Sequence, residues 1–167
     1  FAGLVFSWWY FKKHEIDFMT AGDAIMPGVL IAQALGRWGN FFNQEAYGGA
    51  VSLDFLKSLH LPNFIIDGMF INGQYYHPTF LYESIANVIG FFVIYYVIRK
   101  IQTKQGEQFF SYFIWYGFFR FFIEGLRTDS LYFMGLRTAQ LVSIVFVLAG
   151  IAGYIYCKKF GKPAAKA

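Results

Sequence analysis

The chain has 167 residues, of which 57% are hydrophobic, 23% are aromatic and only 14% are charged. Charged residues make up about a quarter of a typical soluble domain, so this composition indicates a membrane protein. The net charge of +4 comes from short lysine and arginine clusters between apolar runs, which excludes a nucleic-acid surface built from a basic stripe. Cys157 is the only cysteine, so an intramolecular disulfide and a cysteine-based zinc or redox site are excluded. We expect neither a metal nor a cofactor.

The apolar runs predict an all-α, polytopic membrane helix bundle with about five spans. The first run is apolar for eleven residues. At 1.5 Å per residue, it covers about half of a hydrocarbon core roughly 30 Å thick. We therefore expect the chain to be N-terminally truncated within a span. The five spans are predicted at residues 1–11, 24–42, 80–98, 109–126 and 136–156.

The loop between the second and third spans predicts a small folded cap over residues 46–76. Leucines recur at helical spacing within residues 53–59, which is typical of a short amphipathic helix at the membrane interface. Further along, Asn72 and Gly73 stand between two short apolar runs, the usual signal for a type I′ hairpin turn. We expect this cap to consist of one short helix and one hairpin.

The positions of the basic residues predict the orientation in the membrane. Lysines and arginines cluster after the first, third and fifth spans, whereas the long loop before the third span holds only Lys57. By the positive-inside rule, the cap then faces outward and the C-terminus is cytoplasmic. We expect a single transmembrane domain over residues 1–156 and a basic cytoplasmic tail over residues 157–167.

With this topology, the polar residues of four spans fall at one level in the outer half of the bilayer. Tyr116, Arg120, Glu124 and Arg127 follow one another at i, i+4, i+8 and i+11, so they share one helical face. We predict that Glu124 holds the two arginines by charge-assisted hydrogen bonds. The inner half is expected to hold almost no polar residues. The other polar residues at this outer level are Arg37, Asn40, Asn43, Glu45, His77, Tyr82, Glu83 and Arg137.

Two interpretations of this polar cluster remain open. A charge at the bilayer centre costs roughly 2.5–3.5 kcal/mol on insertion scales, so these residues need either ion-pair partners or a functional role. Paired charges could hold the helices together, or the arginines could bind an anionic lipid headgroup. The second interpretation is favoured because four arginines stand near three glutamates. His77 fits either a loop residue or a catalytic base.

Two further functions are compatible with charges inside a membrane. A transporter or flippase for an anionic lipid or solute would need polar residues through the full thickness of the bundle. A non-catalytic scaffold would tolerate replacement of the arginines by well-packed apolar residues.

Three motifs resemble the prolipoprotein diacylglyceryl transferase family of bacteria. They are GRWGNFFNQEAYG at residues 36–48, YYHPTFLYES at residues 75–84 and YGFFRFFIEGLRTD at residues 116–129. The resemblance implies a multi-pass enzyme of the plasma membrane with its active site on the extracytoplasmic side. Such an enzyme moves the diacylglyceryl group of phosphatidylglycerol to the lipobox cysteine in the signal peptide of a prolipoprotein. It forms a thioether and releases glycerol phosphate, which is the first step of bacterial lipoprotein maturation.

The resemblance also assigns roles to residues of this chain. Arg37 and Arg120 would grip the lipid phosphate, and Glu124 would orient Arg120. A further glycine-rich motif of the family, which often carries a histidine, would fall before Phe1, so we expect a protein with these boundaries to be inactive alone. The expected catalytic residues are Arg120, Glu124, His77 and Tyr116, and the expected substrate-binding residues are Arg37, Asn40, Asn43, Glu45, Glu83 and Arg127.

Overall fold

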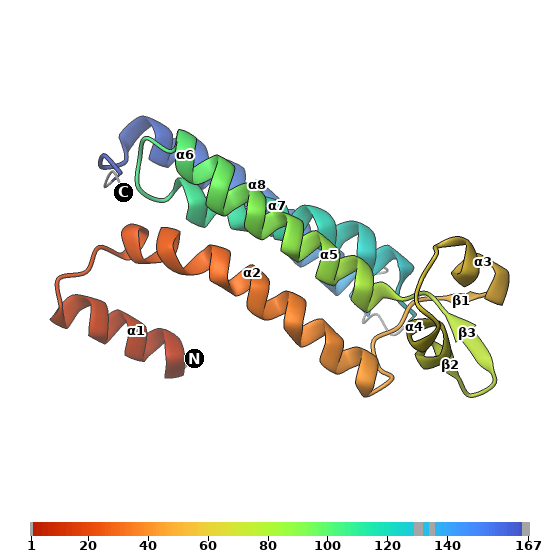
Figure 1. Cartoon of the computed structure of the whole chain (residues 1–167). Coiled ribbons are helices and arrows are strands. Elements are labelled where there is room, and N and C mark those ends of the chain that lie inside the picture. The colour runs from red at the N-terminus through yellow and green to blue at the C-terminus, as the bar shows by residue number, and fades with distance from the viewer. Residues whose placement is uncertain (1, 129–131, 134–135, 165–167) are drawn as a thin grey trace.

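The computed structural model describes residues 2–128, 132–133 and 136–164. Long helices run alongside one another, a small group of strands and short helices lies at one end, and the first helix lies apart from the others (Figure 1). This arrangement confirms the prediction of a mostly helical chain. The elements in chain order are α1 (Ala2–Lys13), α2 (Phe18–Phe42), β1 (Ala50–Val51), α3 (Leu53–Ser58), α4 (Asn63–Gly68), β2 (Phe70–Ile71), β3 (Gln74–Tyr76), α5 (Thr79–Phe92), the π-helix η1 (Val93–Ile98), α6 (Arg99–Ile101), α7 (Glu107–Leu126), β4 (Tyr132–Phe133), β5 (Leu136–Arg137) and α8 (Thr138–Phe160).

Three helices in the described part of the chain are long and apolar enough to cross a membrane, judged by length and composition. They are α2, α8 and the continuous helix Thr79–Ile101, which consists of α5, η1 and α6. Helix α7 covers the predicted fourth span with 20 residues but includes charged side chains. Helix α1 has only 12 residues. The count of five spans therefore stays a prediction.

The boundaries of two predicted spans differ from those of the helices. Helix α2 begins at Phe18, well before residue 24, because the Asp17 side chain accepts hydrogen bonds from the first free backbone N–H groups of the helix. Helix α8 begins at Thr138, since residues 136–137 form β5 and pair with β4. It continues to Phe160, so the first residues of the predicted tail are helical.

The bundle has a core of three helices, α2, α5 and α7, and α8 packs along α7. Glycines allow the close contact between α7 and α8. A Cβ atom on Gly117 would lie 2.8 Å from the backbone oxygen of Ser143, and one on Gly150 would lie 3.0 Å from the backbone nitrogen of Ile114. Small residues at such crossings are typical of helices that pack in membranes. Inside the bundle, Leu30, Ile94 and Tyr112 form a buried cluster.

The cap contains the two elements that the sequence predicts. Strands β2 and β3 form a hairpin whose turn residues Asn72 and Gly73 have φ values of 50° and 83°. Two positive φ values match a type I′ turn and confirm that prediction. The short helix α3 is also present, and β1 extends the hairpin to a sheet with strand order β1-β3-β2. Helix α4 was not predicted. The placement of the cap outside the membrane stays a prediction.

The cap is joined to the bundle by an apolar core. Its side chains come from α3, α4 and the ends of α2 and α5, so the end of α2 and the start of α5 are fixed next to each other. The buried members of this core are Phe41, Leu56, Ile65, Ile66, Met69 and Phe80.

Candidate active site

A buried carboxylate joins the three core helices. Glu83 of α5 lies between Arg37 of α2 and Arg120 of α7. Its two oxygens are 2.9 Å from Nε of Arg37 and 2.6 Å from Nη1 of Arg120. Only 5% of Glu83 is exposed. A buried charge needs such partners, so Glu83 brings two arginines from different helices to one place.

Arg120 also reaches a second carboxylate. Its Nη2 atom lies 2.8 Å from Oε2 of Glu124, and Nε of Arg127 lies 3.9 Å from the same oxygen. Nη1 of Arg137 donates a hydrogen bond to the backbone oxygen of Glu124. The predicted contact of Glu124 with Arg120 is confirmed, and Arg127 lies within ion-pair distance of the same carboxylate. We call the whole set the Arg–Glu cluster, which consists of Arg37, Glu83, Arg120, Glu124, Arg127 and Arg137.

Two hydrogen bonds between helices set the register that forms this cluster. Oγ of Ser84 on α5 donates to the backbone oxygen of Ala34 on α2 over 3.1 Å. Nε1 of Trp115 on α7 donates to the backbone oxygen of Ala86 on α5 over 2.9 Å. Ser84 follows Glu83, and Ala34 precedes Arg37 by one turn. The two contacts therefore hold Glu83 level with its arginine partners.

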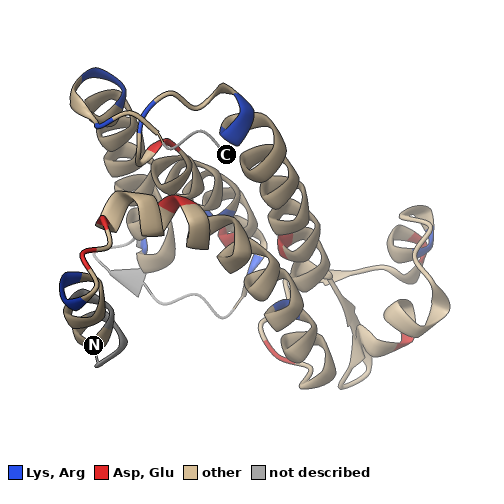
Figure 2. Cartoon of the chain, turned by 60° about the vertical axis from the view of Figure 1, so that its left-hand side comes forward, with Lys and Arg blue, Asp and Glu red and all other residues tan. Residues whose placement is uncertain are grey.

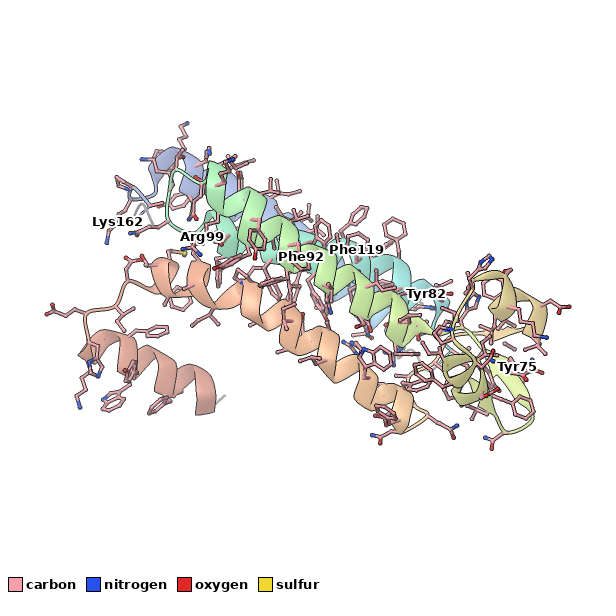
Figure 3. All side chains as sticks on the ribbon, viewed as in Figure 1. Tyr75, Tyr82, Phe92, Arg99, Phe119 and Lys162 are labelled. Atoms are coloured by element: carbon pink, nitrogen blue, oxygen red, sulfur yellow. The ribbon has the colours of Figure 1, made fainter. Side chains whose placement is uncertain are left out.

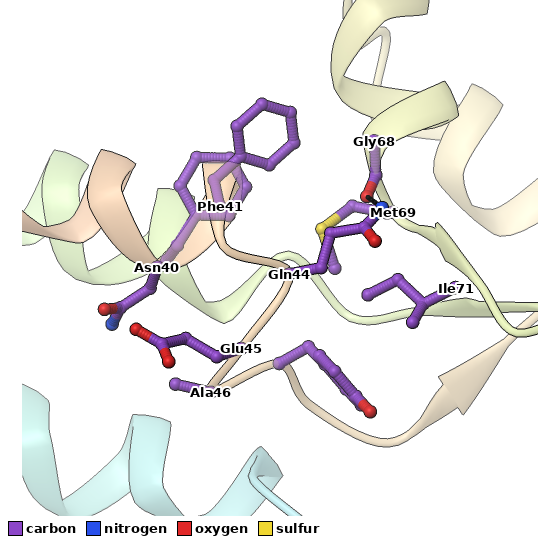
Figure 4. Close-up of a pocket in the computed structure, with 10 residues that line it drawn as sticks. Asn40, Phe41, Gln44, Glu45, Ala46, Gly68, Met69 and Ile71 are labelled. Carbon is purple, nitrogen blue, oxygen red and sulfur yellow. Dashed lines mark hydrogen bonds between the residues drawn. The ribbon is translucent and has the colours of Figure 1, made fainter.

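Asn40, Asn43 and Glu45 lie at the end of α2, where the chain turns into the cap. Nδ2 of Asn43 donates to Oε1 of Glu45 over 3.4 Å. Asn40 and Glu45 line a cavity of about 10 Å³, together with Gln44 and Met69 (Figure 4). That volume accommodates about one water molecule and is too small for a lipid headgroup.

His77 and Tyr82 form a pair where α5 meets the cap, and Figure 3 shows Tyr82 at this end of the helix. Nδ1 of His77 lies 3.3 Å from the Tyr82 hydroxyl oxygen. The His77 ring also contacts the edge of Phe55, with 4.8 Å between ring centroids. Burial lowers the pKa of His77 below its ordinary value, so the ring is neutral at pH 7 and can accept a proton.

Gly48 is a site residue that sequence reasoning missed, although it ends the first motif. Its N–H donates to the backbone oxygen of His77 over 3.0 Å, and the N–H of Gly49 donates to the oxygen of Leu126 over 2.9 Å. A Cβ atom on Gly48 would lie 2.6 Å from Cβ of His77 and 2.9 Å from the oxygen of Leu126. Only glycine fits between these segments. It joins the His77 loop to the end of α7, where Arg127 follows.

Tyr116 lies farther from the cap than Arg120 and Glu124 of α7. Its ring stacks on that of Tyr112, with centroids 5.8 Å apart and an interplanar angle of 6°. It packs against the buried cluster that contains Leu30 and Ile94. Tyr116 therefore belongs to an aromatic layer one turn below Arg120.

Buried polar residues also lie at the end of the bundle away from the cap. Asp23, Glu107 and Gln108 are buried there, just outside the predicted second and fourth spans. Figure 2 shows where acidic and basic residues fall along the helices of the bundle and at its ends. The expectation that the inner half of the spans holds almost no polar residues stays a prediction.

Comparisons with known proteins identify the family. The sequence model of the family described as prolipoprotein diacylglyceryl transferase matches residues 1–156. A protein of Lysinibacillus sphaericus (strain C3-41) is 52% identical over 155 residues, which make up 91% of this chain and 56% of that protein. A protein of Staphylococcus aureus (strain Newman) is 55% identical over 154 residues, which make up 91% of this chain and 54% of that protein.

Both relatives are named phosphatidylglycerol–prolipoprotein diacylglyceryl transferase. The chain spans about half the length of these curated relatives. The motifs, the Arg–Glu cluster and these matches agree, and the chain belongs to the prolipoprotein diacylglyceryl transferase family.

Proposed function

We propose that this protein transfers the diacylglyceryl group of phosphatidylglycerol to the lipobox cysteine of a prolipoprotein. The observation that carries the proposal is the Arg–Glu cluster, in which four arginines stand with two glutamates. Among the described residues, the positive charges of this cluster outnumber its negative charges, which suits the phosphate of an anionic lipid. Purely structural ion pairs would need no such surplus. This would be the first step of bacterial lipoprotein maturation.

The reaction forms one bond and breaks another at the glycerol carbon that carries the phosphate. The cysteine sulfur attacks that carbon, the carbon–oxygen bond to phosphate breaks, and glycerol phosphate leaves with the bonding electrons. Negative charge accumulates on the phosphate oxygens as that bond breaks. Arginine N–H groups that are already in place stabilise such charge without reorganisation.

In this proposal, Arg37 and Arg120 bind the phosphate. An arginine has five N–H donors, and the ion pairs with Glu83 and Glu124 use only some of those of Arg37 and Arg120. Glu83 holds both arginines in position, and Glu124 orients Arg120. The Arg127 and Tyr116 side chains would complete the phosphate site.

The thiol of the second substrate has an ordinary pKa of about 8.5, so it needs a base or a positive field to react at neutral pH. The neutral His77 ring, positioned by Tyr82, is the proposed proton acceptor of this chain. Asn40, Asn43 and Glu45 would bind the glycerol headgroup at the outer end of α2.

The predicted orientation is consistent with this chemistry. We propose a multi-pass protein of the bacterial plasma membrane, with the cap and the Arg–Glu cluster on the extracytoplasmic side and the C-terminus in the cytoplasm. The distribution of lysine and arginine between the loops supports this orientation.

A transporter or flippase for an anionic lipid is the second candidate, because buried polar residues extend beyond the Arg–Glu cluster. One experiment separates the two functions. The protein expressed from its complete gene is mixed in detergent with phosphatidylglycerol and a lipobox peptide, and release of glycerol phosphate is followed. Release that disappears with a Cys→Ser peptide is the result expected of the transferase. Binding of phosphatidylglycerol without any release would overturn the proposal in favour of lipid transport.

A further inference from the structure

A second layer of polar side chains lies next to the Arg–Glu cluster, on the side away from the cap. We call Gln33, Asn87 and Tyr112 the amide layer. Helix α5 runs from the cap into the bundle, whereas α2 and α7 run toward the cap (Figure 1). Each residue of the layer therefore lies one or two turns deeper than a charged residue of its own helix. The pairs are Gln33 with Arg37, Asn87 with Glu83, and Tyr112 with Arg120.

Contacts between the helices bring this layer together. Nε2 of Gln33 donates to the Tyr112 hydroxyl oxygen over 3.0 Å. The hydrogen bond from Ser84 to the backbone of Ala34 places α5 beside Gln33, less than one turn above Asn87. The hydrogen bond from Trp115 to the backbone of Ala86 places α7 beside the residue that precedes Asn87.

Two amide atoms of this layer have unmet hydrogen-bonding capacity. Nδ2 of Asn87 and Oε1 of Gln33 are buried and have no hydrogen-bond partner within the described residues. Asn87 is only 4% exposed. A buried amide without a partner costs free energy, and lipid tails cannot supply one. An unmet donor that faces the interior of a bundle points to an acceptor that arrives with a ligand.

We infer that Asn87 donates a hydrogen bond to an acyl ester carbonyl of the phospholipid whose phosphate lies on the Arg–Glu cluster. The inference rests on the proposed function and adds a subsite to it. Four residues of α-helix advance by about 6 Å. The glycerol backbone of a phospholipid separates its phosphate from its ester carbonyls by a similar distance. The acyl chains then continue away from the cap, into the bundle.

The ester carbonyl would be a hydrogen-bond partner for Asn87 but not for Gln33. A carbonyl accepts a hydrogen bond, so it satisfies the Asn87 N–H group and leaves the Gln33 oxygen unchanged. Gln33 already contacts Tyr112 and acts as a packing partner within the layer. The competing explanation is that the side chains of Asn87 and Gln33 act only as a polar contact that holds α5 against α2.

The test compares two phosphatidylglycerols of equal chain length, one with ester-linked and one with ether-linked chains. The ether lipid keeps the phosphate and the scissile bond but lacks the carbonyls. Glycerol phosphate release is measured as kcat/KM for the protein expressed from its complete gene, its Asn87→Leu variant and its Gln33→Leu variant. Because one hydrogen bond is at stake, we expect the wild-type protein to prefer the ester lipid by about fivefold to tenfold.

We expect Asn87→Leu to abolish this preference by lowering kcat/KM for the ester lipid alone. The Gln33→Leu variant should lower both values equally. Equal losses on both lipids for Asn87→Leu would overturn the inference in favour of the polar contact. If that variant does not fold, Asn87→Ser, which keeps a shorter donor, should show an intermediate preference, and an unchanged preference would overturn the inference.

The wild-type protein separates failure of the inference from failure of the proposed function. Equal release from both lipids refutes the ester subsite and leaves the transferase intact. No release from either lipid refutes the transferase and the subsite together.

Discussion

The two ends of the helix bundle both bury carboxylates, but they use them differently. At the end away from the cap, Asp23 accepts from Nε2 of Gln102 at 2.5 Å and from the backbone N–H groups of Gly106 and Phe109 at 2.7 Å and 2.8 Å. There, N–H donors of the chain itself surround the carboxylate.

Glu107 at the same end is satisfied in the same way. It accepts from the backbone N–H groups of Thr103 and Lys104 at 3.1 Å and 2.7 Å, and it pairs with Lys158 at 3.2 Å. At the cap end, by contrast, the partners are arginines, which outnumber the carboxylates of the Arg–Glu cluster among the residues that the structure describes. The first end has the properties of a structural lock, and we propose that the second uses the remaining N–H donors of Arg37 and Arg120 for a ligand.

Removal of one arginine at the cap end should give the largest effect on activity. We expect Arg120→Ala to lower kcat/KM by about 10²- to 10³-fold, because it removes donors from the developing charge on the phosphate. Arg120→Lys keeps the charge but lacks the planar fork that contacts Glu83 and Glu124, so it should recover only part of the loss. Release of glycerol phosphate measures both. Full activity of Arg120→Ala would make the cluster structural, like the other end.

Removal of the carboxylate at the opposite end should instead affect stability. Asp23→Ala leaves the start of α7 without its acceptor and should lower the free energy of unfolding by about 3 kcal/mol. Asp23→Asn keeps one acceptor oxygen and should lose less. The Tm in detergent gives the stability, and kcat/KM per folded molecule should stay close to that of the wild type. A specific loss of activity in the folded variant would contradict the assignment of this end as structural.

The contrast also shows what sequence reasoning can reach. The ladder on α7 could be predicted because Arg120, Glu124 and Arg127 lie on one helical face at fixed spacing. The hairpin at Asn72 and Gly73 could be predicted because the turn needs two residues with positive φ. Both signals are local in the sequence.

The missed features depend on contacts between distant segments. Glu83 joins Arg37 to Arg120 only because two hydrogen bonds from side chains to backbone oxygens, between residues 50 and 29 positions apart, set the register of the helices. The hydrogen bond between Asp23 and the backbone N–H of Gly106 likewise joins residues that are 83 positions apart. Spacing within one helix does not encode such contacts, so Asp23 was not recognised as a buried acceptor.

Gly48 offers a way to disturb the cap end without touching a charge. Gly48→Ala places a methyl group against His77 and the backbone of Leu126, so we expect destabilisation of about 2 kcal/mol and a loss of activity in the molecules that remain folded. Gly49→Ala is the matched control, because a Cβ atom there meets nothing within 4 Å. Tm and glycerol phosphate release are measured for both. Equal effects of the two substitutions would show that the packing around Gly48 does not position the site.

The smallest expected effect is a pH dependence that comes from His77. Burial holds the pKa of His77 below the unfolded value of 6.5, so the folded state binds fewer protons than the unfolded chain below that pH. The stability due to the neutral ring is complete above the unfolded pKa and is lost as the pH falls through the folded pKa. Wild-type Tm should therefore fall more than that of His77→Gln between about pH 7.5 and about pH 5.5.

Activity gives a second measure of the same group. If the neutral ring accepts the thiol proton, the wild-type rate should decline on the acid side at a pH below 6.5, and His77→Gln should be slower and lack that decline. Groups that titrate elsewhere affect both proteins alike and cancel in the comparison. An acid decline that persists unchanged in His77→Gln would assign the proton acceptor to another residue. His77 would then act only through its contacts with Tyr82 and Gly48.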